Sequence, residues 1–168
     1  PDKGFAWLDL AYDEVDAGLS VIERLTGVRI LDVHVGDAKN VAHPSFFDNA
    51  DTYEIVVFRG LSPETTVDEI VTRPMTFFNF DKLLVTVRAA DSRSCAQVKA
   101  RFVSLPGKAP QSPDDLMQRL LSAMVAWISA RLRTSKASWL CDGGTRWRSS
   151  MSCLASSIIG GRSSALAA

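Results

Sequence analysis

The sequence predicts an α+β fold: an α/β/α sandwich with a mixed, largely antiparallel sheet and helices on both faces. Short apolar segments with strand character recur along the chain, and amphipathic segments of helical length lie between and after them. Two of the strand-like segments are separated only by a tight turn. Because tight turns join antiparallel strands and helical crossovers join parallel ones, we expect a mixed sheet of about six strands.

The composition is that of one folded domain without a strong charge preference. Of the 168 residues, 46% are hydrophobic and 23% are charged, which is close to the average of globular proteins. Lys plus Arg and Asp plus Glu both number 19, so no net charge attracts the chain to nucleic acid or to an anionic membrane surface. The 3 cysteines lack CxxC spacing and favour a reducing compartment over secretion.

The N-terminus and the apolar stretches bear on the origin of the chain. It begins Pro1-Asp2-Lys3, without an initiator methionine or a signal segment, so we expect a piece of a longer protein. The longest apolar stretches are far shorter than the roughly 20 residues that span a bilayer. We therefore expect no membrane helix in this chain.

The N-terminal elements are predicted to be a strand, a helix and a second strand. Residues 5–10 alternate large apolar side chains with small or polar ones, as a strand does. Apolar residues then recur at helical spacing over residues 13–26, and Gly27 follows where a C-cap is expected. Alternation over residues 28–35 predicts a strand, whereas residues 37–42 show no period.

The middle of the chain is predicted to hold a buried strand and a hairpin. Residues 53–58 are apolar and β-branched, and Gly60 with Ser62-Pro63 supplies a turn after them. Residues 75–78 and 82–87 are two further strands, with polar turn residues between them. We expect these two strands to pair antiparallel.

The last predicted elements are two helices separated by a break. Residues 94–103 have an apolar side and a basic side, and residues 105–113 contain 3 prolines that exclude a continuous helix. Ser112 is a favourable N-cap for a second helix, with proline and two acids in its first turn. That helix is predicted to run to about Arg133, with a buried apolar stripe formed by Leu116, Leu120, Met124, Trp127 and Ile128.

The chain is predicted to consist of a domain over residues 1–133 and a tail over residues 134–168. Serine and glycine dominate the tail, and Asp142 is its only acid. Arginines and lysines interleave there with Trp139 and Trp147, a pattern that fits either nucleic-acid stacking or an unstructured segment. We expect a poorly packed or non-native tail and no nucleic-acid partner.

The densest group of possible metal ligands lies before the buried central strand. Its members are His34, His43, Asp32, Asp37, Asp48 and Asp51. Carboxylates suit hard divalent cations and imidazole suits zinc-class ions, so a weak regulatory cation site is one interpretation. A solvated acidic loop is the other, because the spacing matches no ligand motif. A hydrolase and a nucleotide-binding protein are disfavoured, since neither GxSxG nor a P-loop is present.

Four segments form a series along the chain. They are Phe5-Ala6-Trp7-Leu8-Asp9-Leu10; Gly36-Asp37-Ala38-Lys39-Asn40-Val41-Ala42-His43-Pro44 with the following Tyr53 and Phe58-Arg59; the hairpin ending Leu83-Leu84-Val85-Thr86-Val87-Arg88; and Ser112-Pro113-Asp114-Asp115-Leu116 with Leu120-Leu121-Ser122-Ala123-Met124-Val125. In this order they resemble the N-terminal domain of the CorA family of magnesium transporters, which includes zinc-transporting relatives. The resemblance covers residues 5 to about 132. It implies the same α/β/α sandwich.

The resemblance also implies a function for the whole protein. In the family this domain forms a pentameric cytoplasmic funnel at the inner membrane, and it gates the pore when a divalent cation binds. Magnesium is the first ion expected here, with zinc and cobalt as alternatives. The metal ligands expected from the best-matched region are Asp37, Asp48, Asp51 and His43, with no catalytic residue. Gly36 stands where the family often has Glu, and Ser122 and Ala126 stand where it often has Asp.

Two other classes of function remain open from the residues alone. A small soluble metal-dependent enzyme or binding protein could share the sandwich, because a fold does not fix a function. A pocket holding His34 or His43 with a strongly shifted pKa would favour the enzyme. A large exposed apolar patch and indifference to divalent ions would favour a general interaction module.

Overall fold

The residues that the structure describes form one sheet with helices on both of its faces. The computed structural model describes residues 4–66 and 68–141, and the chain divides into two units, the first of which is Pro1–Arg131. The whole sheet lies in the first unit. No helix among the described residues is both long enough and apolar enough to cross a membrane.

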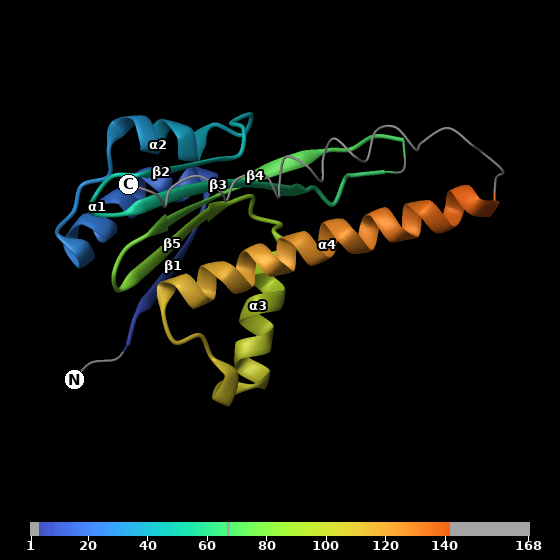
Figure 1. Ribbon diagram of the computed structural model, residues 1–168. Coiled ribbons are helices and arrows are strands. Elements are labelled where there is room, and N and C mark those ends of the chain that lie inside the picture. Colours follow the sequence, from blue (N-terminus) through green and yellow to red (C-terminus); the bar gives the residue numbers. More distant parts are fainter. Residues whose placement is uncertain (1–3, 67, 142–168) are drawn as a thin grey trace, which may run out of the picture. The chain divides into compact units, whose positions relative to one another are not determined.

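The sheet has five strands in the order β1-β5-β4-β3-β2 (Figure 1). The strands are β1 (Ala6–Ala11), β2 (Phe46–Asn49), β3 (Glu54–Leu61), β4 (Thr72–Asn79) and β5 (Leu83–Arg88). β1 and β5 are parallel, and the other three pairs are antiparallel. The parallel pair brings the N-terminal strand beside the strand that precedes the third helix.

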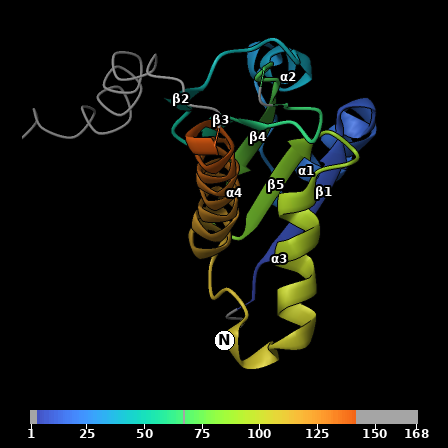
Figure 2. The ribbon, with the colours of Figure 1, turned by 90° about the vertical axis from the view of Figure 1, so that its right-hand side faces the viewer.

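Each face of the sheet is covered by two helices. On one face lie α1 (Val15–Thr26), preceded by the 3-10 turn η1 (Tyr12–Glu14), and α2 (Asp32–Lys39). On the other face lie α3 (Arg93–Ser104), followed by the 3-10 turn η2 (Pro106–Lys108), and the first part of α4 (Pro113–Cys141), which packs there through residues 116–124 (Figure 2). Two separate apolar clusters therefore form the core, one on each side of the sheet.

The alternation of strand side chains explains the two clusters. Phe77 and Phe78 are adjacent in β4 and fully buried, yet Phe77 packs toward α3 and α4 while Phe78 packs toward α1 and α2. Leu84 and Val85 divide in the same way in β5. Both faces of the central strands are thus apolar, which is why these segments read as continuous hydrophobic runs.

The predicted fold class is confirmed, and so are most of the predicted elements. The strand over residues 5–10 is β1, and the helix over residues 13–26 is η1 followed by α1. Gly27 has a φ of 71° and its N–H donates to the Glu23 carbonyl, so it is the left-handed C-cap that its position predicts. The hairpin is β4 and β5, closed by the Phe80 N–H bond to Leu83 O.

The prediction of a strand over residues 28–35 is wrong, because α2 begins at Asp32. Its buried positions are His34 and Ala38, four residues apart, while Val33 is exposed. The polar residue His34 therefore occupies a core position, and the apolar residue Val33 faces solvent. For this reason the hydrophobic pattern indicates the alternation of a strand where the chain forms a helix. β2 was not predicted, and the described residues contain five strands in place of the six expected.

The final helix differs from its prediction mainly in length. Asp115 N–H bonds to Ser112 Oγ at 3.1 Å, which confirms the predicted start. Leu116, Leu120 and Met124 of the predicted stripe are buried, whereas Trp127 and Ile128 are only half-buried. The helix ends at Cys141, eight residues beyond the predicted Arg133. Residues 142–168 of the predicted tail lie outside the described residues, and the domain boundary at residue 133 stays a prediction.

Candidate functional site

The predicted metal ligands occupy different places around the loop between α2 and β2. Asp37 lies in the last turn of α2, His43 lies in the loop, and Asp48 lies on β2. Asp51 is in the turn after β2, with a φ of 63° and with its N–H bonded to the Asn49 side chain. The structure thus brings Asp37 and His43 together but places Asp48 and Asp51 in other contacts. No group of three His, Cys, Asp or Glu side chains suited to a metal occurs among the described residues.

Asp37 and His43 form a close pair at the end of α2. Asp37 Oδ1 lies 3.1 Å from His43 Nε2. The other ring nitrogen, Nδ1, lies 2.8 Å from the Pro44 carbonyl oxygen and must carry a proton to donate to it. The ring also packs on Phe46, with 4.8 Å between the ring centres. The pair is partly open to solvent, with the His43 side chain 18% exposed and the Asp37 side chain 21% exposed.

Arg59 fixes the loop that carries His43. Its Nη1 donates to the carbonyl oxygens of Val41 at 3.0 Å and of His43 at 2.8 Å. Its Nε and Nη2 donate to Thr72 on the neighbouring strand β4, at 2.9 and 2.7 Å. Its backbone N–H donates to Ser45 Oγ at 3.0 Å. One side chain therefore ties the loop to two strands, which fixes the position of the His43 backbone.

His34 belongs to a buried polar group rather than to the loop pair. Leu31 N–H donates to the Tyr53 hydroxyl oxygen at 3.0 Å, which leaves the hydroxyl proton for His34 Nδ1 at 2.8 Å. His34 Nε2 then carries the ring proton and donates to Asp48 Oδ2 at 3.2 Å. All members have partners in this arrangement, so the group fastens α2 to β2 and to the start of β3. Burial raises the pKa of the Tyr53 phenol, so the hydroxyl stays protonated at neutral pH.

Replacing Tyr53 by Phe should therefore destabilise the protein. The change leaves the Leu31 N–H without its acceptor and buried His34 Nδ1 without its donor, and we expect a loss of about 1 to 3 kcal/mol in the free energy of unfolding. Urea denaturation of the variant and of the parent chain measures the difference. Unchanged stability would contradict the assigned hydrogen bonds. Asp32→Asn is the control, because its carboxylate makes only an exposed contact with Arg29.

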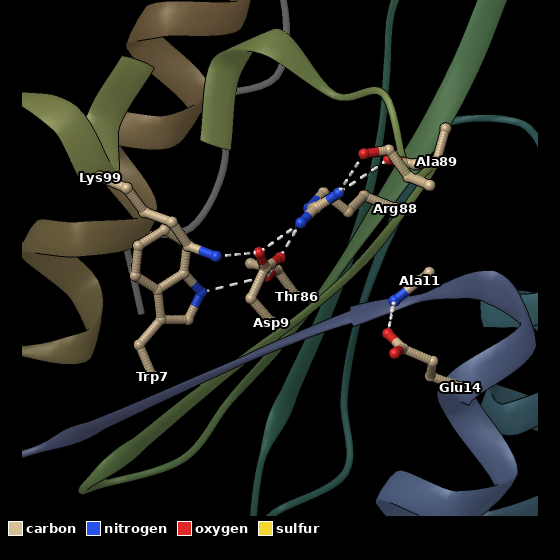
Figure 3. Close-up of polar contacts among 9 residues, drawn as sticks. Trp7, Asp9, Ala11, Glu14, Thr86, Arg88, Ala89 and Lys99 are labelled. Atoms are coloured by element: carbon tan, nitrogen blue, oxygen red, sulfur yellow. Dashed lines mark hydrogen bonds and ion pairs between the residues drawn. The ribbon is translucent and has the colours of Figure 1, made fainter. Parts of the chain in front are cut away.

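A second polar cluster, which the sequence did not predict as a unit, lies between the sheet and α3. Asp9 on β1 accepts hydrogen bonds from Arg88 Nε at 2.8 Å and Nη2 at 2.6 Å (Figure 3). Lys99 on α3 and the Thr86 hydroxyl also donate to this carboxylate, and Trp7 Nε1 donates to Thr86 Oγ1 at 3.0 Å. The cluster joins β1, β5 and α3. The Asp9 side chain is only 6% exposed.

The electrostatics of this cluster indicate a structural role. Burial would raise the pKa of Asp9, but the hydrogen bonds from Arg88, Lys99 and Thr86 outweigh burial and lower it. Burial raises the pKa of the neighbouring Cys95 thiol to about 11, so Cys95 is a protonated core side chain at neutral pH. Every charge in the cluster already has a partner. It therefore offers no free nucleophile and no free metal ligand.

Several solved structures share the fold of this chain. The structure of the full-length CmaX protein matches 83% of this chain with a TM-score of 0.62 at 14% sequence identity. The ZntB cytoplasmic domain from Vibrio parahaemolyticus matches 76% with a TM-score of 0.60 at 14% identity. The soluble domain of CorA from Methanocaldococcus jannaschii matches 79% with a TM-score of 0.57 at 15% identity. At these identities the matches show a shared fold, which is the fold that the four resembling segments imply.

The matches cover only part of the solved proteins. The chain spans 43% of the CmaX chain, 50% of the ZntB chain and 51% of the CorA soluble chain. No protein-family profile matches the sequence. No curated protein matches it significantly either.

Proposed function

We propose that this chain is the N-terminal cytoplasmic domain of a CorA-type divalent-cation transporter, where it senses cations and gates the pore. The observation that carries the proposal is the agreement of fold with the ZntB and CorA domains over 76% and 79% of the chain. The four sequence segments that resemble the CorA family support it from a separate direction. They include β1, the loop after α2, the β4–β5 hairpin and the start of α4.

A cation can regulate such a domain only if it binds one arrangement better than another. The proposed ligands are Asp37 and His43, which the structure brings together, with Asp48 and Asp51 as further carboxylates. The Asp48 side chain is 58% exposed and Asp51 is also exposed, so a hydrated ion can reach both. Magnesium, zinc and cobalt are the candidate ions.

The proposal extends to the assembly of the full-length protein. There the domain would form a pentamer below the membrane helices, and cations held between subunits would stabilise the closed arrangement. Release of the cations would remove that stabilisation and allow the pore to open. The domain itself carries out no chemistry in this proposal.

Thermal unfolding in the presence of single divalent ions tests the proposed function. Magnesium, zinc or cobalt should raise the unfolding midpoint relative to EDTA, because a ligand at about 100 times its Kd adds about 2.7 kcal/mol to stability. Potassium at matched ionic strength is the control for simple screening. A midpoint that no divalent ion raises would contradict a cation-sensing role for this domain.

A further inference from the structure

We infer that Asp37 and His43 form a two-ligand site for a first-row transition ion of the zinc class, in preference to magnesium. The inference rests on the proposed function and names the ion that acts at this place. It follows from the orientation of the His43 ring, from the spacing of the two ligand atoms and from the way the loop is held.

The orientation of His43 leaves one ring nitrogen for a metal. Nδ1–H is held by the Pro44 carbonyl at 2.8 Å, which places the lone pair of a neutral ring on Nε2. A backbone carbonyl is one of the usual partners of the second nitrogen in a metal-binding histidine, because this hydrogen bond fixes both the tautomer and the ring plane. Nε2 points at the Asp37 carboxylate.

The spacing of the two ligand atoms fits one small ion. Zinc binds imidazole nitrogen and carboxylate oxygen at about 2.0 to 2.2 Å, so two such ligands at octahedral to tetrahedral angles lie about 2.9 to 3.4 Å apart. Asp37 Oδ1 and His43 Nε2 are 3.1 Å apart. A direct ion pair between a protonated His43 ring and the Asp37 carboxylate has the same separation. Binding of a metal ion by the neutral ring distinguishes a metal site from such an ion pair.

The surrounding structure holds both ligands near this geometry. Asp37 is fixed by the last turn of α2, and the His43 backbone is fixed by the hydrogen bond from Arg59. Phe46 packs against the His43 ring and limits its rotation. Partial exposure of both side chains lets water complete the coordination shell. The nearby Arg59 charge and the small number of protein ligands predict modest affinity.

The ligand types determine the class of ion. Imidazole binds zinc, cobalt and nickel well, whereas magnesium prefers oxygen ligands and keeps most of its water. Cys95 does not compete for the ion, because its thiol is buried and protonated at neutral pH. The pair should therefore bind zinc at least about tenfold more tightly than magnesium.

Nuclear magnetic resonance of the imidazole protons tests the site directly, because the chain has only 2 histidines. Zinc is titrated into the chain carrying Cys141→Ser and Cys153→Ser, so that those thiols cannot bind it. We expect the His43 resonances to move and those of His34 to stay in place. Asp37→Asn and His43→Gln should each reduce zinc affinity at least tenfold, while the control Asp81→Asn, at an exposed position in the turn between β4 and β5, should leave it unchanged.

Three results would overturn the inference. They are no movement of the His43 resonances, equal affinity with and without the Asp37 carboxylate, and magnesium binding at His43 as tight as zinc binding. If a divalent ion still raises the unfolding midpoint of the Asp37→Asn variant, the proposed function stands and this assignment of its site fails. If zinc moves the His43 resonances but no ion changes the midpoint, zinc binds the unfolded chain as well as the folded one, and both the folded site and the sensing role fail.

Discussion

Replacing Asp9 by Asn should lower the free energy of unfolding by about 3 kcal/mol, near the lower end for a broken buried ion pair. The Arg88 side chain is only 16% exposed, and its charge would lose the carboxylate that holds it. Lys99 is 48% exposed and can be solvated in the variant, which is why we expect the lower end of the range. Urea denaturation at neutral pH measures the loss.

The same variant should also change the dependence of stability on pH. The pKa of Asp9 is lower in the folded protein than in the unfolded chain, so its contribution is complete above the unfolded pKa. That contribution disappears as the pH falls through the folded pKa, and the Asp9→Asn chain should lack this acid-side loss. Asp16→Asn is the matched control, since the pair of Asp16 with Lys39 is exposed and should change stability by less than about 1 kcal/mol. Equal effects of the two variants would contradict the cluster shown in Figure 3.

Replacing Phe77 by Ala should cost about 3 to 5 kcal/mol, because a fully buried aromatic side chain leaves a cavity that the core cannot fill. Phe77 is 0% exposed and packs in the cluster that joins β4 to α3 and α4. Both helices should lose support in the variant. Urea denaturation followed by far-ultraviolet circular dichroism measures the change.

Phe47 supplies the control for Phe77. It lies in the same row of the sheet, since Phe47 pairs with Val56 and Val56 pairs with Phe77. Phe47 is on the edge strand β2 and is 62% exposed, so Phe47→Ala should change stability by less than about 1 kcal/mol. A Phe47→Ala variant as unstable as the Phe77→Ala variant would contradict the exposed position of the Phe47 side chain on the edge strand β2.

Local sequence patterns are sufficient to predict a helix or strand where its hydrophobic period and the signals at its ends agree. α1 has a helical apolar period and is followed by its C-cap Gly27. The predicted helix is confirmed, except that its first residues form the 3-10 turn η1. The β4–β5 hairpin has two apolar strands around a polar turn and is also confirmed. In both elements the local preferences of the residues agree with the structure that they adopt in the fold, so no distant contact is needed to predict the element.

Distant contacts decide the elements that the pattern misses. α2 buries His34 because Tyr53 and Asp48, 19 and 14 residues away, satisfy its ring nitrogens. β2 is short and largely exposed, and its pairing with β3 defines it better than its own sequence does. Neither relation can be read from the hydrophobic period of the segment itself.

The candidate site could be predicted only in part, again because some of its contacts join residues that are distant in the sequence. Asp37 and His43 lie six residues apart across a helix end, so a local pattern could place them in one region. Asp9 meets Arg88 and Lys99 across 79 and 90 residues, and only the parallel pairing of β1 with β5 and the position of α3 bring them together. Alternation along β1 could have indicated that Asp9 shares a face with Trp7, but not which cations meet it.

Amide hydrogen exchange of the purified chain, with zinc, with magnesium and with EDTA, tests the central claim most directly, because it locates the segment that a bound ion stabilises. Our account predicts that zinc slows exchange in residues 37–46 and in the adjoining part of β3, with a smaller effect of magnesium. Exchange in this segment that is the same in all three conditions would contradict a cation-sensing domain that acts through the loop after α2.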